Sequence, residues 1–327
     1  MSKPLVLTCD IGTQSARALL VDPDGRIVDV VQSKYAEPYF SKEPGWAEQK
    51  PDFYFDRLCE CCCELCARSN ALLPDVIAMT IRDTVVCLDA NNEPLRDIIL
   101  WLDKRTVDPN GAMPAKNMML FKVAGMEPTA KVVYAASAGN WIMRHEPEIW
   151  ARTAKYVMLP TYLNYKLTGN LIDSASNQIG HIPFDYKNRR WMKPGSLTRC
   201  FCDVPNEKLC DLVPSGTVIG TVTDEVCALT GIPAGLPLIS TGSDKGCETL
   251  GLAVVDSDKA SISLGTTATI QFSTTEYVEP QQFLPAYPGV LNDHYNPEIE
   301  IYRGLWLLSW FVKEFGTADA IDAKEKG

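Results

Sequence analysis

The chain has 327 residues, of which 46% are hydrophobic and 22% are charged, and its formal net charge is −10. This length predicts two domains, and the excess of acidic residues argues against nucleic acid or an anionic membrane as the main partner. No stretch reaches the roughly 18 apolar residues that a membrane span requires. The N-terminus lacks the features of a secretory signal, so we expect a cytoplasmic protein.

The first 35 residues alternate between apolar runs and short polar turns. We expect three strands, over residues 4–10, 16–22 and 26–35, with a tight hairpin joining the last two. Because helical segments follow these strands, the pattern predicts an α/β architecture.

The turn between the first two strands, Gly12 to Ser15, is small and rich in hydroxyl groups, and Asp10 and Arg17 flank it. Glycine lets backbone N–H groups approach an anion closely, and the hydroxyls add donors. An aspartate can hold Mg²⁺ through water beside a phosphate, and an arginine can neutralise phosphate charge. Hairpin turns are routinely built from the same residue types, so this turn alone leaves both interpretations open.

The chain contains 12 cysteines, and five of them fall in a predicted helix over residues 52–70. Without a secretory signal we expect reduced thiols. Four of the five share one helical face, but ligands spread over two turns of a straight helix cannot surround a tetrahedral ion. We therefore expect the cysteines to act as small apolar side chains packed beside the leucines of this helix, namely Cys59, Cys62, Cys63 and Cys66.

Residues 76–95 predict a buried strand followed by a hairpin. At the end of the strand, Arg82 and Asp83 place a donor fork beside an acceptor, the combination that a polyhydroxyl ligand requires.

Trp101 follows in the chain, close to Asp103 and Arg105. These three residues could belong to the same ligand site. The alternative is that Trp101 is a core residue and that Asp103 and Arg105 form a surface ion pair of little energetic value. Helices are expected over residues 141–152 and 159–167.

Residues 219–255 predict a strand, a helix, a glycine- and proline-containing loop, a second strand and a second helix. The second strand leads to Asp244, whose carboxylate can accept a proton from an alcohol or simply cap the helix. Residues 262–270 then repeat the opening pattern of strand, turn and strand, with Gly265 and Thr266 in the turn. Two such turns are similar to two halves of a clamp around a triphosphate.

The last predicted helix is followed by a polar run without further core-forming segments. A second domain that begins near Val254 would have only about 70 residues, which is small for an α/β core. We therefore expect a C-terminally truncated chain.

Taken in order, these segments resemble the FGGY family of carbohydrate kinases. The resemblance covers nearly the whole chain and is carried by six collinear stretches: CDIGTQSARALLVDPDG, PGWAEQKP, RDTVVCLDANNEPLRDIILWLDKRT, PTYLNYKLTGNLIDSASN, GIPAGLPLISTGSDKGCETLG and ISLGTTATI. It implies an actin/hexokinase-type (ribonuclease H-like) fold with ATP and sugar between two domains. Residues 1–253 would form the sugar-binding domain, and residues 254–327 the start of a truncated nucleotide-binding domain.

The resemblance also implies a role for each matching residue. Asp244 looks like the general base, and Asp10 looks like the acidic residue that holds Mg²⁺ through water. The residues similar to the ATP phosphate loops are Gly12, Thr13, Gln14, Arg17, Gly265 and Thr266. The implied substrate contacts are Arg82, Asp83, Trp101, Tyr134, Asp244 and Lys245.

Three positions depart from the glycerol kinases, which the Arg82-Asp83-Thr84 run otherwise resembles. Lys245 stands where they carry glutamine, Thr269 where they place an aromatic residue, and Ala138 where many members have lysine. The polar Thr269 suggests a larger or more polar ligand than glycerol, and the cation beside Asp244 suggests an acidic group on it.

The function expected is ATP-dependent phosphorylation of a hydroxyl on a pentulose, sugar alcohol or glycerol-like polyol, with weak or absent activity in the truncated chain. A non-catalytic sugar-binding or regulatory fragment and an actin-like structural ATPase are the alternatives. The actin-like ATPase is disfavoured, since a filament subunit would not need a polyol pocket. The residues that suit such a pocket are Arg82, Asp83, Trp101 and Asp244. The sugar, its reacting hydroxyl and the oligomeric state, including a homodimer, stay open.

Overall fold

The computed structural model describes residues 4–69, 74–80, 84–265, 267–301 and 304–316. By compactness the chain divides into two units, Met1–Asp244 and Lys245–Gly327. The expected domain boundary after residue 253 stays a prediction. Three expected site residues, Arg82, Asp83 and Thr266, lie outside the described residues.

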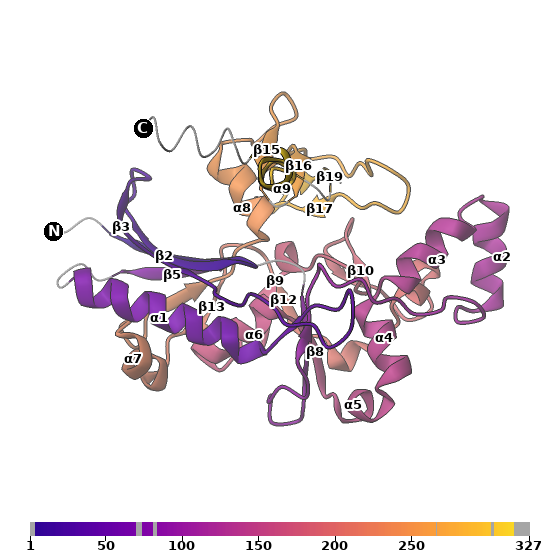
Figure 1. Ribbon diagram of the computed structural model, residues 1–327, viewed down its shortest axis with the longest axis horizontal. Coiled ribbons are helices and arrows are strands. Elements are labelled where there is room, and N and C mark those ends of the chain that lie inside the picture. The colour runs from indigo at the N-terminus through magenta and orange to yellow at the C-terminus, as the bar shows by residue number, and fades with distance from the viewer. Residues whose placement is uncertain (1–3, 70–73, 81–83, 266, 302–303, 317–327) are drawn as a thin grey trace. The chain divides into compact units, whose positions relative to one another are not determined.

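The first unit is built on a six-stranded sheet (Figure 1). In spatial order its strands are β13 (Val218–Thr221), β14 (Pro237–Ile239), β5 (Val76–Thr80), β1 (Val6–Ile11), β2 (Ser15–Val21) and β3 (Ile27–Lys34). The β1–β2 and β2–β3 pairs are antiparallel, whereas β5 runs parallel to both β1 and β14. The three opening strands expected from the sequence are thereby confirmed, and with them the mixed α/β architecture.

One face of this sheet packs against α1 (Pro51–Ser69), as Figure 1 shows. Alternate residues of β1 point to this face, and Leu7, Cys9 and Ile11 are almost fully buried. They share a core with Leu58 and Leu65 of α1, and with α6 (Leu159–Thr168) and α7 (Asp224–Thr230). The period of two in the strands and the helical spacing of the leucines explain this packing.

The cysteines of α1 follow the same amphipathic pattern. Cys61 and Cys62 lie in the core between helix and sheet, so the expectation of small apolar residues is confirmed for Cys62. It is wrong for Cys63, which is exposed because it lies on the opposite face of the helix. Burial raises the pKa of the Cys61 thiol to about 11. Among the described residues, no group of three or more histidine, cysteine or acidic side chains is arranged to hold a metal ion.

Cys63 is expected to react with iodoacetamide faster than any other cysteine of α1. The thiolate is the nucleophile, so a buried thiol with a raised pKa reacts slowly at pH 8, whereas Cys63 is open to solvent. Mass spectrometry of native protein after brief alkylation measures this order. Equal labelling of Cys61 and Cys63 in the folded chain would contradict the packing of α1.

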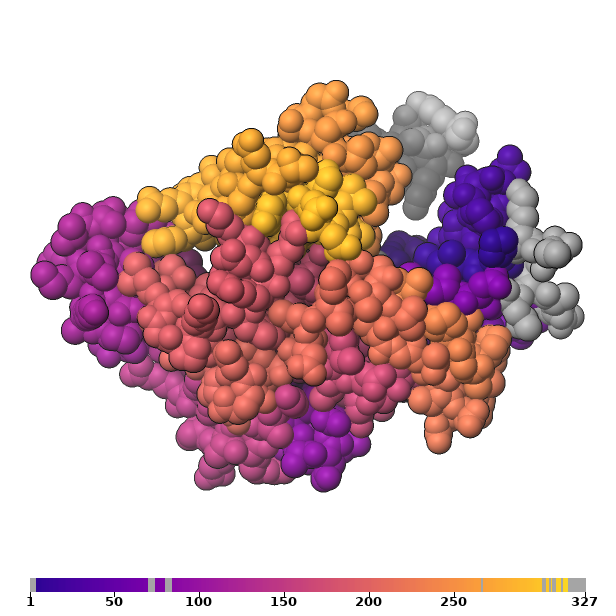
Figure 2. Space-filling model, turned by 180° about the vertical axis from the view of Figure 1, so that it is seen from behind, coloured from indigo at the N-terminus to yellow at the C-terminus, as the bar shows by residue number. Residues whose placement is uncertain are grey.

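A second core lies beside a four-stranded sheet of β4 (Glu48–Gln49), β7 (Ile98–Ile99), β6 (Val85–Leu88) and β8 (Lys155–Met158). It contains Trp141, Tyr156 and Phe184. The helices α4 (Ala138–His145) and α5 (Pro147–Arg152) pack on this core, and the same unit contains α2 (Ala115–Val123) and α3 (Glu127–Ala135). In Figure 2, α2 forms the end of this unit at the left.

The single helix expected over residues 141–152 is in fact the pair α4 and α5. Pro147 has no backbone N–H and disfavours helical geometry in Glu146, which adopts φ −128° and ψ 55°. The remaining elements of this unit are short: β9 (Ile172–Ser174), η1 (Ala175–Asn177), β10 (Phe184–Asp185), β11 (Arg190–Trp191), η2 (Leu197–Phe201), η3 (Asn206–Lys208) and β12 (Asp211–Val213).

The second unit contains a three-stranded antiparallel sheet of β15 (Ser261–Leu264), β16 (Ala268–Gln271) and β19 (Glu298–Ile301). The expected repeat of strand, turn and strand over residues 262–270 is confirmed. The other elements are α8 (Asp244–Gly251), which spans the junction of the units, β17 (Tyr287–Pro288), β18 (Tyr295–Asn296) and α9 (Trp306–Phe315).

The faces of this sheet differ from the usual arrangement. Ile262, Ile270 and Ile299 lie opposite one another across the three strands, and all three are exposed. On the other face, Gln271 is buried and donates to Glu298 Oε2 over 2.8 Å. The apolar face is therefore the uncovered one. No helix in the described part of the chain is both long and apolar enough to cross a bilayer.

Candidate functional site

The β1–β2 hairpin brings Asp10 and Arg17 together. They are register partners on adjacent antiparallel strands, and Arg17 Nη1 lies 2.6 Å from Asp10 Oδ2. The side chain of Arg17 is 42% exposed and that of Asp10 is 38% exposed, so both groups face solvent. The hairpin thus presents one acidic and one basic group directly beside its turn.

The turn itself is closed by Gly12, whose N–H donates to the Ser15 carbonyl over 2.9 Å. A Cβ atom on Gly12 would lie 3.3 Å from that carbonyl, which explains a residue without a side chain here. Among the described residues, the backbone N–H groups of Thr13 and Gln14 have no protein acceptor. Two such groups at an open turn suit an anionic ligand.

Trp101 contacts this turn from a distant part of the sequence. Its indole Nε1–H donates to Thr13 Oγ1 over 2.9 Å, and the residue is 36% exposed. The alternative of a core tryptophan is therefore wrong. The structure joins a residue expected to contact sugar with a residue expected to contact phosphate.

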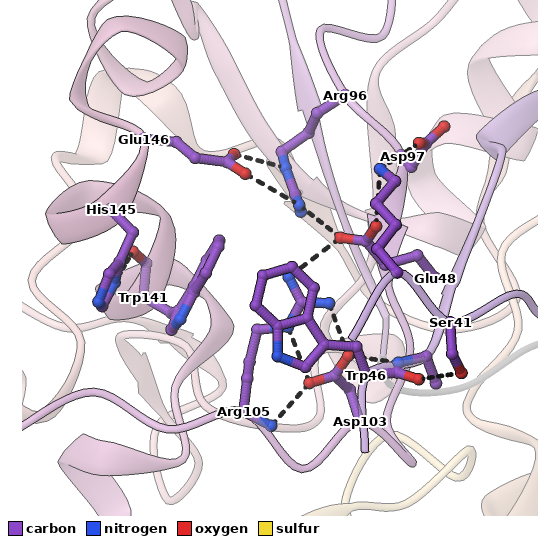
Figure 3. Close-up of polar contacts among 12 residues, drawn as sticks. Ser41, Trp46, Glu48, Arg96, Asp97, Asp103, Arg105, Trp141, His145 and Glu146 are labelled. Atoms are coloured by element: carbon purple, nitrogen blue, oxygen red, sulfur yellow. Dashed lines mark hydrogen bonds and ion pairs between the residues drawn. The ribbon is translucent and has the colours of Figure 1, made fainter. Parts of the chain in front are cut away.

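A buried ion-pair network follows Trp101 in the chain (Figure 3). Arg105 donates twice to Asp103, from Nε to Oδ1 over 2.8 Å and from Nη2 to Oδ2 over 2.7 Å. Its Nη1 donates to Glu48 Oε1 over 3.0 Å. The guanidinium carbon lies 3.7 Å and 4.7 Å from the ring centres of Trp46 and Trp141. The alternative of a surface ion pair is therefore also wrong.

The same network extends to the second arginine in Figure 3. Arg96 Nη2 donates to Glu48 Oε1 over 2.8 Å, and its Nε lies 2.7 Å from Glu146 Oε2. Lys42 Nζ adds a contact of 2.9 Å to Glu48 Oε2. The Glu48 side chain is 1% exposed, and its carboxylate contacts three cations, those of Lys42, Arg96 and Arg105. Glu48 and Arg96 were not among the residues expected from the sequence, although Glu48 lies in the PGWAEQKP stretch and Arg96 in the stretch that contains Trp101.

Asp244 is the first residue of α8, directly after the loop that leaves β14. Asp244 is partly exposed. The preceding residue, Ser243, is buried, and its N–H donates to the Ser176 carbonyl over 3.1 Å. The expected helix start after the strand is confirmed.

Lys245 contacts two residues of the second unit. Its Nζ lies 3.0 Å from Glu248 Oε1 and donates to Ser263 Oγ over 2.8 Å. Glu248 therefore offsets the charge that suggested an acidic ligand. The spacing of three residues on one helix was the signal in the sequence for this pair.

Tyr134 lies on α3 and is half-buried, and burial raises the pKa of its phenol. Its carbonyl accepts from Asn140 Nδ2 over 3.0 Å. In the part of the chain that the structure describes, Tyr134 forms no hydrogen bond with Trp101 or with Thr13. The structure thus does not bring this expected substrate residue to the turn. Ala138, the third departure from the family pattern, begins α4.

The second turn, between β15 and β16, is one residue shorter than the first. Leu264 pairs with Ala268, and the Gly265 N–H donates to the Thr267 carbonyl over 2.9 Å. Thr269 follows on β16 and is buried on the polar face of the sheet. The two turns are alike in having a glycine N–H that bonds back across the loop.

Solved structures identify the fold. The chain matches the crystal structure of a xylulose kinase from Rhodospirillum rubrum with a TM-score of 0.80 at 22% identity, over 98% of this chain and 65% of that chain. It also matches Plasmodium falciparum glycerol kinase with ADP, with a TM-score of 0.77 at 18% identity, over 95% and 64%. The fold is that of the actin/hexokinase-type sugar kinases, as the sequence predicted.

Sequence comparison then identifies the family. The model of the FGGY family of carbohydrate kinases, N-terminal domain, matches residues 5–251, and the chain belongs to this family. It is 25% identical to an uncharacterized sugar kinase of Escherichia coli, over 99% of this chain and 59% of the relative. It is 25% identical to the xylulose kinase of Bacillus subtilis, over 81% and 52%. The chain thus spans between half and three fifths of the length of these curated relatives.

Proposed function

We propose that this chain contributes the sugar-binding and phosphate-binding parts of a kinase that transfers the γ-phosphoryl group of ATP to a hydroxyl of a small sugar or polyol. The observation that carries the proposal is the hydrogen bond from Trp101 to Thr13. It links a side chain that suits a sugar to a turn that suits a phosphate, as a phosphoryl transfer between the two substrates requires.

The first turn fits the phosphates of ATP. Its N–H groups at Thr13 and Gln14 supply donors, and Arg17, whose Nη1 bonds Asp10, adds further N–H groups. Mg²⁺ fits beside it, since the Asp10 carboxylate is 38% exposed and bonds Arg17 through one oxygen. Asp10 would hold the ion through water, and the ion would offset phosphate charge. In the second unit, Gly265 supports a comparable turn, and Thr266 stays a prediction.

Asp244 is proposed as the general base. Its carboxylate would orient the attacking sugar hydroxyl and take its proton as the oxygen attacks the γ-phosphorus. Its place at the start of α8, on a loop fixed by Ser243, supports this role, because a base must be held in one position.

A pentulose is the proposed substrate class, with xylulose as its representative. The support comes from relatives that are named xylulose kinases. A sugar acid is disfavoured, because Glu248 already offsets the charge of Lys245. Arg82 and Asp83 stay proposed as contacts to the sugar hydroxyls.

Xylulose without nucleotide is expected to raise the melting temperature of the chain. A ligand at about 100 times its Kd stabilises the native state by about 2.7 kcal/mol. Differential scanning fluorimetry with xylulose, gluconate and ATP measures the effect, with sucrose at the same concentration as the osmolyte control. Stabilisation by ATP alone would favour the actin-like ATPase, and a larger shift with gluconate would overturn the proposed substrate class. Xylulose binding without turnover, in an enzyme that carries this chain, would favour the regulatory sugar-binding protein.

A further inference from the structure

Three buried serine hydroxyls form a connected chain in the first unit. Ser174 Oγ lies 2.8 Å from Ser215 Oγ, and Ser215 Oγ lies 3.0 Å from Ser176 Oγ. Ser174 and Ser176 belong to β9 and η1, whereas Ser215 follows β12, about 40 residues further along the chain. All three residues are buried. We call these three residues the serine relay.

The serine relay ends on the backbone just ahead of Asp244. The Ser215 hydroxyl donates to the Thr241 carbonyl over 3.2 Å, and the Ser243 N–H donates to the Ser176 carbonyl over 3.1 Å. A serine hydroxyl has one proton, so Ser215 shares it between the Thr241 carbonyl and Ser176 Oγ. The segment that leads into α8 is therefore held by two residues of the relay.

The other end of the serine relay is anchored on Asp173, which is fully buried. Its carboxylate accepts from Thr161 Oγ1 over 2.8 Å, from Asn177 Nδ2 over 3.0 Å and from Gln178 Nε2 over 3.2 Å. The Ser174 N–H donates to it as well, over 2.8 Å. Burial raises the pKa of Asp173, and these donors oppose the shift. The turn that carries Ser174 and Ser176 is thereby fixed from the inside.

We propose that Ser174, Ser176 and Ser215 are positioning residues for Asp244. They act through the Thr241–Ser243 backbone and touch neither sugar nor nucleotide. The inference rests on the proposed role of Asp244, and it adds a polar network that connects this residue to the interior of the first unit. Loss of the central hydroxyl lets the loop move, so the base is misplaced while the remaining sugar contacts persist.

Hydrogen exchange tests the structural half of this inference on the chain itself. In Ser215→Ala, the peptide over residues 241–247 is expected to exchange at least about tenfold faster than in the unaltered chain. Thr217→Ala is the matched control, because it also removes a hydroxyl from this loop. The hydroxyl of Thr217 donates to the Pro214 carbonyl and not to the segment that leads into α8. Unchanged exchange in Ser215→Ala, or an equal effect of Thr217→Ala, would overturn the inference.

Kinetics test the catalytic half in an enzyme that carries this chain, with xylulose and ATP. Ser215→Ala is expected to lower kcat about 10- to 100-fold with little change in the KM for xylulose, and Ser215→Thr, which keeps the hydroxyl, to restore most of it. In an Asp244→Asn background, Ser215→Ala is expected to have no further effect, since positioning and base act as one unit.

The outcomes separate the inference from the proposed function. A fall in kcat that simply adds to that of Asp244→Asn, or a rise in KM alone, would overturn the positioning role while the kinase function stands. Absence of turnover with any sugar in the unaltered enzyme would count against the proposed function instead, and hydrogen exchange then decides the relay by itself.

Discussion

Asp244→Asn is expected to lower phosphoryl transfer by about 10²- to 10⁴-fold in an enzyme that carries this chain, the range typical of a lost general base. Asparagine has the size of aspartate and keeps one oxygen that accepts a hydrogen bond, but it cannot take the proton of the sugar hydroxyl. Sugar-induced stabilisation should therefore persist. Initial rates with xylulose and ATP, together with the melting temperature with and without xylulose, measure both effects.

Asp224→Asn provides the control for this prediction. Asp224 is likewise the first residue of a helix, α7, and it is exposed. Its replacement removes the same charge from the same kind of helix position, where the interaction with the helix dipole is worth less than about 1 kcal/mol. Turnover should stay within a factor of two. A rate for Asp244→Asn close to that of Asp224→Asn would remove Asp244 as the base.

Glu48→Ala is expected to reduce the free energy of unfolding by about 1–3 kcal/mol, the cost of leaving buried hydrogen-bond donors without an acceptor, while Asp103 and Glu146 still pair with Arg105 and Arg96. Arg96 and Arg105 both donate to Glu48 Oε1, and the side chain of Arg105 is only 3% exposed. The substitution leaves these cations in the interior without their shared carboxylate. Urea unfolding followed by tryptophan fluorescence measures the change, since Trp46 and Trp141 lie against Arg105.

The matched control is Glu60→Ala on α1. Glu60 also pairs with an arginine, Arg57, but its side chain is 51% exposed. Exposed pairs contribute about 0–1 kcal/mol, so the unfolding curve should barely move. If Glu48→Ala cost no more than Glu60→Ala, the network in Figure 3 would not stabilise the fold.

Local pattern in the sequence predicted those parts of the fold that depend on neighbours in the chain. Alternation of apolar residues placed β1, β2 and β3, and glycine with hydroxyl residues placed both turns. The fold class and family followed from an ordered set of such segments. The helix break at Pro147 was equally local and could have been predicted from the residue itself.

Long-range contacts explain what the sequence did not predict. Asp103 and Arg105 looked like a surface pair because Glu48, Trp46 and Trp141, which bury them, are far away in the chain. The contact of Trp101 with Thr13 spans 88 positions, and no local pattern encodes it. The serine relay was missed for the same reason, since isolated serines resemble ordinary turn residues.

The sheet of the second unit has a practical consequence for protein engineering. Ile262, Ile270 and Ile299 are exposed in the described part of this chain, so replacing them by lysine or glutamate removes no buried contact from the described residues. The same changes at Gln271 or Glu298, on the covered face, would break a buried hydrogen bond. When this chain is prepared by itself, solubilising substitutions in this unit therefore belong at the exposed isoleucines and not at the buried polar residues.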